Sequence, residues 1–419
     1  MDTVPTLAVP VSPPVRAREA RVDVRTPLRV LAVLPAVPFP SNSGGLLRSL
    51  TQLRSLDAHF QLTVLALQRP LQDAEALRRS LTARVITVPF QAGGPEAMAA
   101  ELGALTLGKP LFYARYAPRA LARALEEALR KEPFDVVHFD HLHTAQLVPL
   151  VRKLQPRARV VLDQHNVEAQ LVERMAPLAA PHLRLGLRWQ ARRLRKLETQ
   201  IVREVDAVLA CSSLDAAQFH KMGARCVEVV PNPATVDVHT TGRLPRRDIA
   251  YVGSFDWWPN IDAALVLAKD IWPRCEGKLP DARLMIVGRD PPEAILQLAS
   301  PRVIVTGRVP SVGPYLDGAR VAAVPLRAGS GTRLKILEAW AHGVPVVSTP
   351  LGAEGLPVRD GENVLLAEKP EHFARALLRV FEEPSLAAQL TEGALRSARA
   401  YHPARIGEQL AAFYRERLG

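Results

Sequence analysis

The chain has 419 residues, a hydrophobic content of 48% and a charged content of 23%, which are ordinary for globular proteins and exclude disorder throughout. This length exceeds one ordinary core, so at least two domains are expected. The net charge of +12 favours phosphorylated partners or an anionic membrane surface, although a solvated arginine-rich surface explains it equally. The chain lacks an aromatic-interleaved basic platform and zinc-finger spacing, so nucleic acid is not an expected partner.

The three cysteines, Cys211, Cys226 and Cys275, are far apart and form no Cys-x-x-Cys pair. They indicate neither a disulfide framework nor a zinc site, and they fit a reducing compartment. The apolar runs are of strand length, and prolines interrupt the N-terminal segment where a signal peptide needs a continuous apolar region. We therefore expect a cytoplasmic protein, either free or peripheral on the inner face of the membrane.

Residues 1–27 contain proline, valine and arginine without a stable period and are predicted to form a mobile tail. From Leu28 onward, short apolar runs alternate with longer helical patterns, which is typical of parallel βα units. Strands are expected at residues 29–34, 62–67, 85–88, 136–138, 160–163, 207–211 and 226–230 in the first half, and at 249–252, 283–287, 303–306, 321–324 and 344–348 in the second.

Two such series predict an α/β protein with two doubly wound, Rossmann-like parallel-sheet domains. The break falls within residues 231–247, where Pro, Thr, Gly and Arg replace the apolar periodicity. We therefore expect an N-terminal domain over residues 28–240, a C-terminal domain over 241–400 and a last helix over 401–419. Ligands of such sheets bind beyond the carboxyl ends of the strands, so the loops after the strands are the candidate functional loops.

Two of these loops in the N-terminal domain carry distinctive residues. Gly44 and Gly45 follow the first strand and permit a close approach of the backbone to a ligand, although a plain strand–helix turn explains them equally. His138, Asp140 and His141 cluster at the end of a later strand. No spacing here matches a helical histidine pair with a third ligand, so a metal site is not expected.

A helix is expected over residues 182–205, with one apolar stripe and a strongly basic remainder. The stripe consists of Leu183, Leu187, Leu194, Leu197, Ile201 and Val205. Packing of this stripe into the N-terminal domain is the plain interpretation. Contact between the basic face and anionic lipid headgroups, close to a lipid-linked acceptor, is a further hypothesis.

The most informative segment is residues 325–349, which read PLRAGSGTRLKILEAWAHGVPVVST. A strand ends near Pro325, the turn at residues 329–331 bends the backbone, and a helix is expected from Thr332 to just before Gly343. A glycine-rich turn that feeds a helix N-terminus binds anions through unpaired N–H groups and the helix dipole. Gly329, Ser330, Gly331 and Thr332 are therefore candidate phosphate-binding residues.

Charged side chains extend this candidate anion site. Arg333 and Lys335 bring positive charge to the start of the helix, and Glu338 shares a face with Lys335. At a rise of about 1.5 Å per residue, Glu338 lies roughly 9 Å beyond Thr332, which suits a diphosphate at the helix start and a ribose diol at the carboxylate. A surface Lys–Glu pair on an ordinary helix is the alternative interpretation.

Residues 325–363 resemble the donor-binding region of family-4 retaining glycosyltransferases, the glycosyltransferase group 1 with the GT-B fold. The resemblance extends to YVGSFDWWPN at residues 251–260, VTGR at 305–308 and DQHNVE at 163–168, and it covers nearly the whole chain after the tail. It implies two domains that face a central cleft and a C-terminal helix that returns to the N-terminal domain.

The resemblance also implies residue roles. Lys335 would contact the donor diphosphate and Glu338 its ribose, while the turn residues would meet phosphate through backbone N–H groups. Among the catalytic candidates, His141 is the first choice to contact the transferring sugar or the acceptor hydroxyl. The catalytic candidates are His141, Asp140, His138 and Lys335. The donor-binding candidates are Gly44, Gly45, Gly253, Ser254, Arg308, Gly329, Ser330, Gly331, Thr332, Arg333, Lys335 and Glu338.

The sequence departs from the family pattern in two places. The family usually has two glutamates separated by seven residues, and Ser330 stands at the first of these positions. Many members place an arginine and a lysine in the loop after the first C-terminal strand, whereas the loop at residues 254–260 carries neither. These departures weaken any inference about which sugar is carried.

The expected function is transfer of a hexose from a nucleotide diphosphate sugar, with retention, to a glycan, lipid-linked or small-molecule acceptor. An Asp-x-Asp motif, which holds a divalent cation in metal-dependent transferases, is absent from the sequence, so no metal or other cofactor is expected. Two alternatives remain open, a sugar-nucleotide epimerase of the same fold and a catalytically silent module that binds nucleotide sugars. Ser330, which stands where the family usually has a glutamate, is the feature that keeps the second alternative open.

Overall fold

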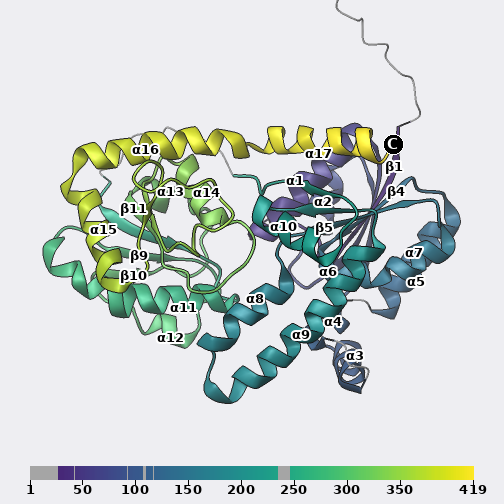
Figure 1. Ribbon diagram of the computed structural model, residues 1–419, viewed down its shortest axis with the longest axis horizontal. Coiled ribbons are helices and arrows are strands. Elements are labelled where there is room, and N and C mark those ends of the chain that lie inside the picture. Colours follow the sequence, from purple (N-terminus) through teal and green to yellow (C-terminus); the bar gives the residue numbers. More distant parts are fainter. Residues whose placement is uncertain (1–26, 42, 92, 107–109, 117, 235–245) are drawn as a thin grey trace, which may run out of the picture.

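The computed structural model describes residues 27–41, 43–91, 93–106, 110–116, 118–234 and 246–419. These residues form two lobes, each built around a parallel β-sheet (Figure 1). The predicted mobile tail, apart from its last residue, and the predicted domain boundary between residues 240 and 241 lie outside the described residues.

The strands of the N-terminal sheet are β1 (Arg29–Leu34), β2 (Gln61–Gln68), β3 (Arg84–Pro89), β4 (Val136–Asp140), β5 (Arg159–Gln164), β6 (Ala207–Ala210) and β7 (Val227–Val229). Their order is β3-β2-β1-β4-β5-β6-β7, so the chain reverses direction across the sheet between β1 and β4, as in doubly wound folds. The helices of this lobe are α1 (Gly44–His59), α2 (Ala74–Ser80), α3 (Pro95–Thr106), α4 (Leu111–Ala114), α5 (Arg119–Lys131), α6 (His141–Thr144), α7 (Val148–Leu154), α8 (Glu168–Met175), α9 (Pro181–Glu204) and α10 (Ser213–Met222).

The strands of the C-terminal sheet are β8 (Asp248–Val252), β9 (Leu284–Val287), β10 (Val303–Val305), β11 (Ala319–Val324), β12 (Val346–Ser348) and β13 (Leu365–Leu366). They are parallel in the order β10-β9-β8-β11-β12-β13, with the reversal between β8 and β11. The helices that follow β8 are α11 (Trp258–Val266), α12 (Glu293–Leu296), α13 (Gly313–Asp317), α14 (Leu334–Ala341), α15 (Pro370–Glu382), α16 (Pro384–Ala398) and α17 (Pro403–Arg417).

The apolar strand runs form because helices cover both faces of each sheet, so inward and outward side chains are both buried. In β1, the residues from Val30 to Leu34 are at most 1% exposed and divide between two apolar clusters on opposite faces of the sheet. The predicted fold class is confirmed, and each predicted strand is present with ends within two residues of those expected. The two-residue strand β13 was not predicted, because so short a segment has no period.

The last helix, α17, crosses from the C-terminal lobe to pack on α1 of the N-terminal lobe (Figure 1). Leu410, Phe413 and Tyr414 belong to the N-terminal core, and Ser55 Oγ donates to the backbone oxygen of Gly407 at 2.6 Å. The last helix therefore connects the two lobes and packs its end against the first helix of the chain.

The described thiols of Cys211, Cys226 and Cys275 are free. Among the described residues, no helix combines the length and the apolar character needed to span a bilayer.

Candidate functional site

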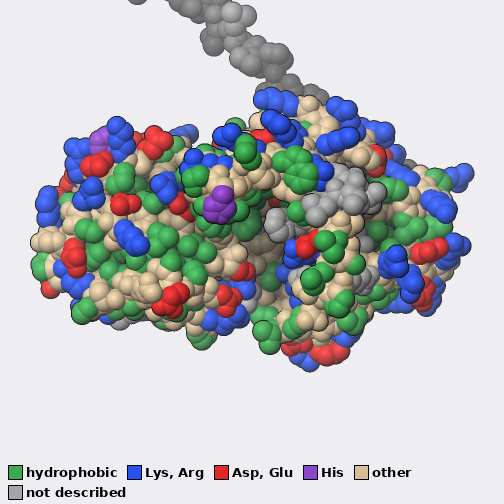
Figure 2. Space-filling model, turned by 90° about the horizontal axis from the view of Figure 1, so that it is seen from below, with side chains coloured by type: hydrophobic (Ala, Val, Ile, Leu, Met, Phe, Trp, Pro, Cys, Tyr) green, Lys and Arg blue, Asp and Glu red, His purple; other side chains and the backbone are tan. Residues whose placement is uncertain are grey.

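The candidate site lies where the carboxyl ends of the two sheets face each other. The N-terminal lobe contributes the loops after β1, β4 and β5, and the C-terminal lobe those after β8 and β11. The lobes approach closely here: a Cβ atom at Gly44 would lie 1.9 Å from Leu334 Cδ1, and one at Gly331 would lie 2.3 Å from the backbone oxygen of His165. Gly331 therefore requires glycine, whereas at Gly44 the tip of Leu334 would have to move, and a hollow lies between the lobes (Figure 2).

The N-terminal wall contains a buried network around Asp140 and His165. Asp140 ends β4 and accepts a hydrogen bond from Ser49 Oγ at 2.6 Å. His165 Nε2 lies 2.7 Å from Asp140 Oδ1 and 3.2 Å from Asp163 Oδ2, so the ring bridges the ends of two neighbouring strands. This bridge fixes both loops relative to the sheet.

Arg48, from α1, completes the N-terminal network. Its guanidinium donates to both carboxylate oxygens of Asp163, with Nε 2.9 Å from Oδ2, and to the backbone oxygen of Val230 at 2.7 Å. The side chains of Arg48 and Asp163 are 1% and 0% exposed. The pair is therefore fully desolvated, and each charge depends on the other.

These charges set the protonation of the network. Burial opposes the charged form of His165, but Asp140 and Asp163 outweigh it and raise the pKa of His165 to about 9. Burial also opposes ionisation of Asp140, yet His165 and then His141 outweigh it and lower the pKa of Asp140 to about 2. At neutral pH the network is therefore a set of paired ions.

His141 lies against this network and beside Gly45. Its φ of 65° is in the left-handed region, which is uncommon for a residue with a side chain, and its ring centroid is 3.5 Å from that of His165. Burial, followed by the charge of His165, lowers the pKa of His141 to about 3, so this ring is neutral at pH 7. Its Nδ1 is buried and has no hydrogen-bond partner among the described residues.

The structure thus brings Asp140 and His141 together but directs His138 elsewhere. His138 is 3% exposed, and its Nδ1 lies 2.7 Å from the hydroxyl of Tyr414 on α17. This ring therefore joins the packing between β4 and the last helix, a contact that the order of residues along the chain does not reveal.

The glycine turn of the C-terminal wall follows β11, and α14 begins at Leu334 rather than at the predicted Thr332. The delay has a physical reason: Gly331 has a φ of 71°, and Arg333 is extended, so neither is helical. The guanidinium of Arg333 is buried in the turn and donates to the backbone oxygens of Ser330 and Gly331. This arginine therefore holds the shape of the turn from inside.

The backbone N–H groups of the turn, unlike its oxygens, are not hydrogen bonded to the described residues. Those of Gly329, Ser330, Gly331 and Thr332 donate to none of the described residues, which leaves them available to a ligand. They directly precede the N-terminal end of α14, where the helix dipole favours negative charge. This stretch of backbone is therefore a candidate anion site.

Lys335 and Glu338 lie one turn apart on α14. Lys335 Nζ donates to Asn260 Oδ1 at 2.8 Å and to the hydroxyl of Tyr251 at 3.1 Å, and it lies 4.3 Å from the centre of the Tyr251 ring. Neither Lys335 nor Glu338 has an ion-pair partner within 4.0 Å among the described residues. Burial lowers the pKa of Lys335 to about 7 and raises that of Glu338 to about 7, so both side chains change protonation state near pH 7.

The remaining donor candidates divide into two groups. Gly253 lies next to Lys335, because a Cβ atom at Gly253 would be 3.2 Å from Lys335 Nζ. Ser254 Oγ donates to Asp256, and the half-exposed Arg308 pairs with Asp290. The structure therefore brings Gly253 to the site around Lys335. The backbone oxygen of Ser254 accepts from Asn260 beside that site, whereas Arg308 is paired with a carboxylate away from it.

Contacts between the lobes converge on the glycine turn. Ser330 Oγ accepts a hydrogen bond from the backbone N–H of Val167 at 3.0 Å, and Asn232 Nδ2 donates to Thr332 Oγ1 at 2.8 Å. Arg174, on α8, donates to the backbone oxygen of Gly329 at 2.8 Å. The N-terminal lobe thus holds the turn at several points.

Sequence reasoning missed four residues of this arrangement, namely Arg48, Asp163, Asn232 and Arg174. Arg174 also forms a two-pronged ion pair with Glu354 across the lobes. Asp163 begins the DQHNVE segment at residues 163–168, but its partner Arg48 lies 115 residues earlier, and no spacing rule connects the two residues.

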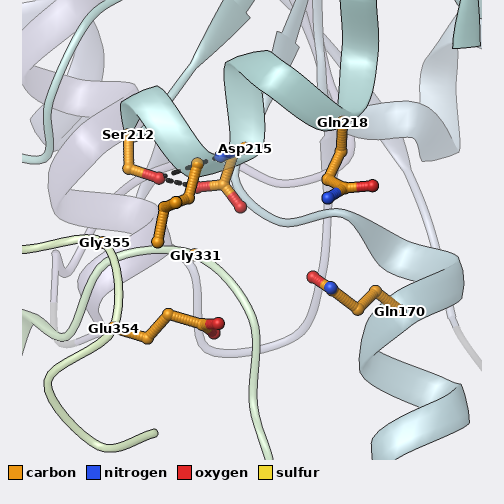
Figure 3. Close-up of a pocket in the computed structure, with 8 residues that line it drawn as sticks. Gln170, Ser212, Asp215, Gln218, Gly331, Glu354 and Gly355 are labelled. Atoms are coloured by element: carbon orange, nitrogen blue, oxygen red, sulfur yellow. Dashed lines mark hydrogen bonds between the residues drawn. The ribbon is translucent and has the colours of Figure 1, made fainter. Parts of the chain in front are cut away.

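A small pocket of about 80 Å³ lies beside the turn, between α8, α10 and the C-terminal lobe (Figure 3). Ser212 and Asp215 are hydrogen bonded to each other on one side, Glu354 lies below them, and the amides of Gln170 and Gln218 are on the far side. The two carboxylates disfavour an anionic ligand here. An anion is therefore better matched to the turn amides and Lys335 than to this pocket.

Asp140, His141 and His165 are the described residues whose ligand atoms lie close enough together to hold a metal ion, within 4.8 Å of one another. The carboxylate of Asp140 is already bonded to Ser49 and His165, and the raised pKa keeps His165 protonated at neutral pH. A metal would have to displace that proton, because only neutral imidazole is a ligand. The absence of a metal requirement stays a prediction.

Comparison with known proteins agrees with this two-lobed arrangement. The description "Glycosyl transferase 4-like domain" matches residues 66–233, and "Glycosyl transferases group 1" matches residues 246–383. The crystal structure of the Anabaena protein HepE in complex with UDP and glucose superposes with a TM-score of 0.66 at 15% identity, covering 93% of this chain and 100% of that one. The architecture is the GT-B fold.

Two relatives have higher sequence identity. A D-inositol 3-phosphate glycosyltransferase of Nocardioides sp. is 28% identical over 354 residues, which are 71% of this chain and 72% of that protein. A protein of the same name from Acidothermus cellulolyticus is 29% identical over 185 residues, so this chain spans only 41% of that relative's length. The chain thus contains a glycosyltransferase 4-like domain followed by a glycosyltransferases group 1 domain, which confirms the resemblance found in the sequence.

Proposed function

We propose that this chain is a retaining, metal-independent glycosyltransferase that moves a hexose from a nucleoside diphosphate sugar to an acceptor. One observation carries the proposal: four consecutive N–H groups, at residues 329–332, donate to none of the described residues and lead into a helix that presents Lys335 and Glu338. Neither of these two side chains has an ion-pair partner within 4.0 Å in the part of the chain that the structure describes. A diphosphate supplies the negative charge that this arrangement lacks.

The proposed chemistry follows from charge development. Cleavage of the bond between the sugar C1 and the diphosphate leaves negative charge on the leaving group. The turn amides, the N-terminal end of α14 and Lys335 stabilise that charge, and donor binding favours the charged form of Lys335. Glu338, about 4.5 Å further along the helix axis, accepts hydrogen bonds from the ribose hydroxyls. A divalent cation is not needed for this stabilisation.

The opposite wall supports retention without a covalent sugar–enzyme intermediate. Asp140 and Asp163 are both held in ion pairs with His165 or Arg48, so neither is a free nucleophile for C1. The neutral ring of His141 beside Gly45 is suited to hydrogen bond the transferring sugar or the acceptor hydroxyl. Contact between the lobes at the glycine turn excludes water and favours transfer over hydrolysis.

The acceptor is proposed as a class only. The relatives carry the name of an enzyme acting on D-inositol 3-phosphate, and the HepE structure holds UDP and glucose. For this chain we propose a glycan, a lipid-linked sugar or a small polyol as acceptor, in polysaccharide biosynthesis in the cytoplasm, with no role for nucleic acid.

Two other functions fit the same architecture, and each would give a different result when the chain is incubated with donor. A catalytically silent module is favoured by Ser330, whose hydroxyl is engaged by Val167 and which stands where the family usually has a glutamate. It would bind donors without turning them over. An epimerase would convert one sugar nucleotide into another.

The test begins with thermal stabilisation by a panel of nucleoside diphosphates and their sugars, with and without EDTA, followed by donor consumption. Lys335→Met and Glu338→Gln are the test variants, and Lys131→Met, an exposed lysine on α5, is the matched control. We expect a selective shift that survives EDTA, is lost in both test variants and persists in the control. No shift with any nucleotide would contradict the proposed donor site, and a shift without turnover would favour the silent module.

A further inference from the structure

The helix α9 has two halves with different surroundings. In its second half, Ala191, Leu194, Ile201 and Val202 are at most 3% exposed and pack into the N-terminal lobe. The first residues, from Pro181 to Gly186, are exposed on every side of the helix. The apolar stripe expected from the sequence is therefore buried only along part of its length, and the start of α9 projects beyond the body of the lobe (Figure 1).

This projecting half carries large apolar side chains in water. Leu183 is 51% exposed, Leu185 is 77% exposed and Trp189 is 41% exposed. Leu185 and Trp189 are four residues apart, so they share one face of the helix, opposite the buried stripe. Single exposed apolar residues are common, but a leucine and a tryptophan side by side on a projecting helix mark an interaction surface.

The same face is strongly basic. Residues 181–197 contain Arg184, Arg188, Arg192, Arg193, Arg195 and Lys196 and no acidic residue. Arg195 pairs with Glu173, and the guanidinium of Arg193 lies 3.4 Å from the centre of the Trp189 ring. Arg188 and Arg192 are exposed and have no partner among the described residues. Apolar and basic side chains are interspersed on this side of the molecule (Figure 2).

We propose that the outer face of α9, formed by Leu185, Arg188, Trp189 and Arg192, docks on an anionic lipid bilayer. Leu185 and Trp189 enter the headgroup region, where an aromatic ring with a polar edge is well accommodated. Arg188 and Arg192 reach the lipid phosphates, while their aliphatic stems stay against the apolar surface. This binding is independent of the transfer chemistry proposed above.

Two other occupants fit less well. A nucleic acid would pair with the arginines but would leave Leu185 in water. A symmetric contact between two copies of the chain would bury the leucines but would place arginines of one copy against those of the other. An anionic bilayer satisfies both features at once.

The position of α9 gives the docking a consequence for the cleft. The chain passes from α8, where Arg174 contacts the glycine turn, to the exposed start of α9 within seven residues. A bilayer bound at α9 would therefore contact a helix that begins seven residues after Arg174, which holds the candidate donor site. An acceptor embedded in that bilayer would reach the cleft without leaving the membrane.

The experiment is flotation of the full chain with vesicles of phosphatidylcholine alone, or with about one third phosphatidylglycerol. The variants are Leu185→Ser with Trp189→Ser, and Arg188→Glu with Arg192→Glu. Arg375→Glu with Arg405→Glu is the matched control, because both arginines are exposed and lie on α15 and α17. All of these side chains are exposed, and thermal unfolding checks that each variant is folded.

We expect the wild-type chain to float with the anionic vesicles and not with the neutral ones. Each pair of α9 substitutions should lower the bound fraction at least about tenfold, while the control stays within about twofold of wild type. The proposal is overturned if the wild-type chain ignores anionic vesicles, or if the α9 variants bind like the control. It is overturned as well if the Leu185 and Trp189 variant instead abolishes a dimer seen by light scattering.

Discussion

The two walls of the cleft hold their charges in opposite ways. On the N-terminal wall, Arg48 is paired with Asp163 and Asp140 with His165, and every charge is matched at hydrogen-bond distance. On the C-terminal wall, Lys335 is hydrogen bonded to neutral groups, and the carboxylate of Glu338 has no ion-pair partner among the described residues.

The pKa values express this difference. The pairs of the N-terminal wall stabilise the charged forms, which raises the pKa of His165 to about 9 and lowers that of Asp140 to about 2. Burial without a counterion moves Lys335 and Glu338 toward their neutral forms, with both pKa values near 7. The charges of the first wall are matched within the wall, whereas we expect the second to gain stability from a ligand that supplies charge and hydrogen bonds.

The largest expected effect on stability comes from breaking the buried Arg48–Asp163 pair of the N-terminal wall. Arg48→Met leaves the fully buried carboxylate of Asp163 without its main partner, and we expect a loss of about 3–5 kcal/mol in the free energy of unfolding. Urea unfolding at pH 7 measures this change. Arg54→Met is the control on the same helix, because Arg54 is exposed. An equal, small effect of both substitutions would show that the N-terminal wall does not depend on the pair.

The same chemical change on the other wall should act with the opposite sign on stability. Lys335→Met removes a buried charge that has no ion-pair partner within 4.0 Å among the described residues, so the free energy of unfolding should stay unchanged or rise by up to about 2 kcal/mol. The catalytic efficiency toward the donor should fall by about 10²–10³-fold, because a charge aimed at the diphosphate is lost. A variant that is less stable yet fully active would contradict the comparison.

The pH dependence of stability gives a second test of the difference between the two walls, through the titration of Glu338. Its pKa is raised from 4.5 to about 7, so its contribution to stability is fully present below pH 4.5 and is lost as the pH rises through 7. Glu338→Gln removes this loss. The stability difference, variant minus wild type, should therefore grow between pH 4.5 and 7 and then level off at about 1–3 kcal/mol. Unfolding free energies at pH 5, 6, 7 and 8 test this, and a difference that is flat with pH would contradict it.

The smallest expected effect concerns the contact between the walls. Arg174→Ala removes the hydrogen bond to the backbone oxygen of Gly329 and the ion pair with Glu354, so the glycine turn is held less firmly. We expect the KM for the donor to rise about 3- to 10-fold with a smaller change in kcat, as for the loss of about 1 kcal/mol in positioning. Arg174→Lys should restore part of the loss, and Glu354→Gln should reproduce part of it. An unchanged KM would show that the turn keeps its shape without Arg174.

The sequence predicted the strands and the glycine turn well, but it said little about which side chains contact each other in the folded protein. The strands were predicted because a buried parallel strand is a continuous apolar run, a signal contained in the strand itself. The glycine turn and the Lys335–Glu338 spacing were predicted because one short segment carries them. The start of α14 was predicted two residues too early, since the positive φ of Gly331 and the inward guanidinium of Arg333 are features of the folded turn.

From the sequence alone, the two parallel sheets, the loops that follow their strands, the glycine turn and the family resemblance were predicted. Only the tertiary structure decided that His138 faces Tyr414 rather than the cleft, that Arg48 neutralises Asp163, and that Arg174 reaches across to Gly329. It also decided that the start of α9 is exposed while its end is buried. The physical reason is the same in each case: periodicity and turn chemistry act between near neighbours in the chain, whereas charge pairing and burial depend on residues more than a hundred positions away.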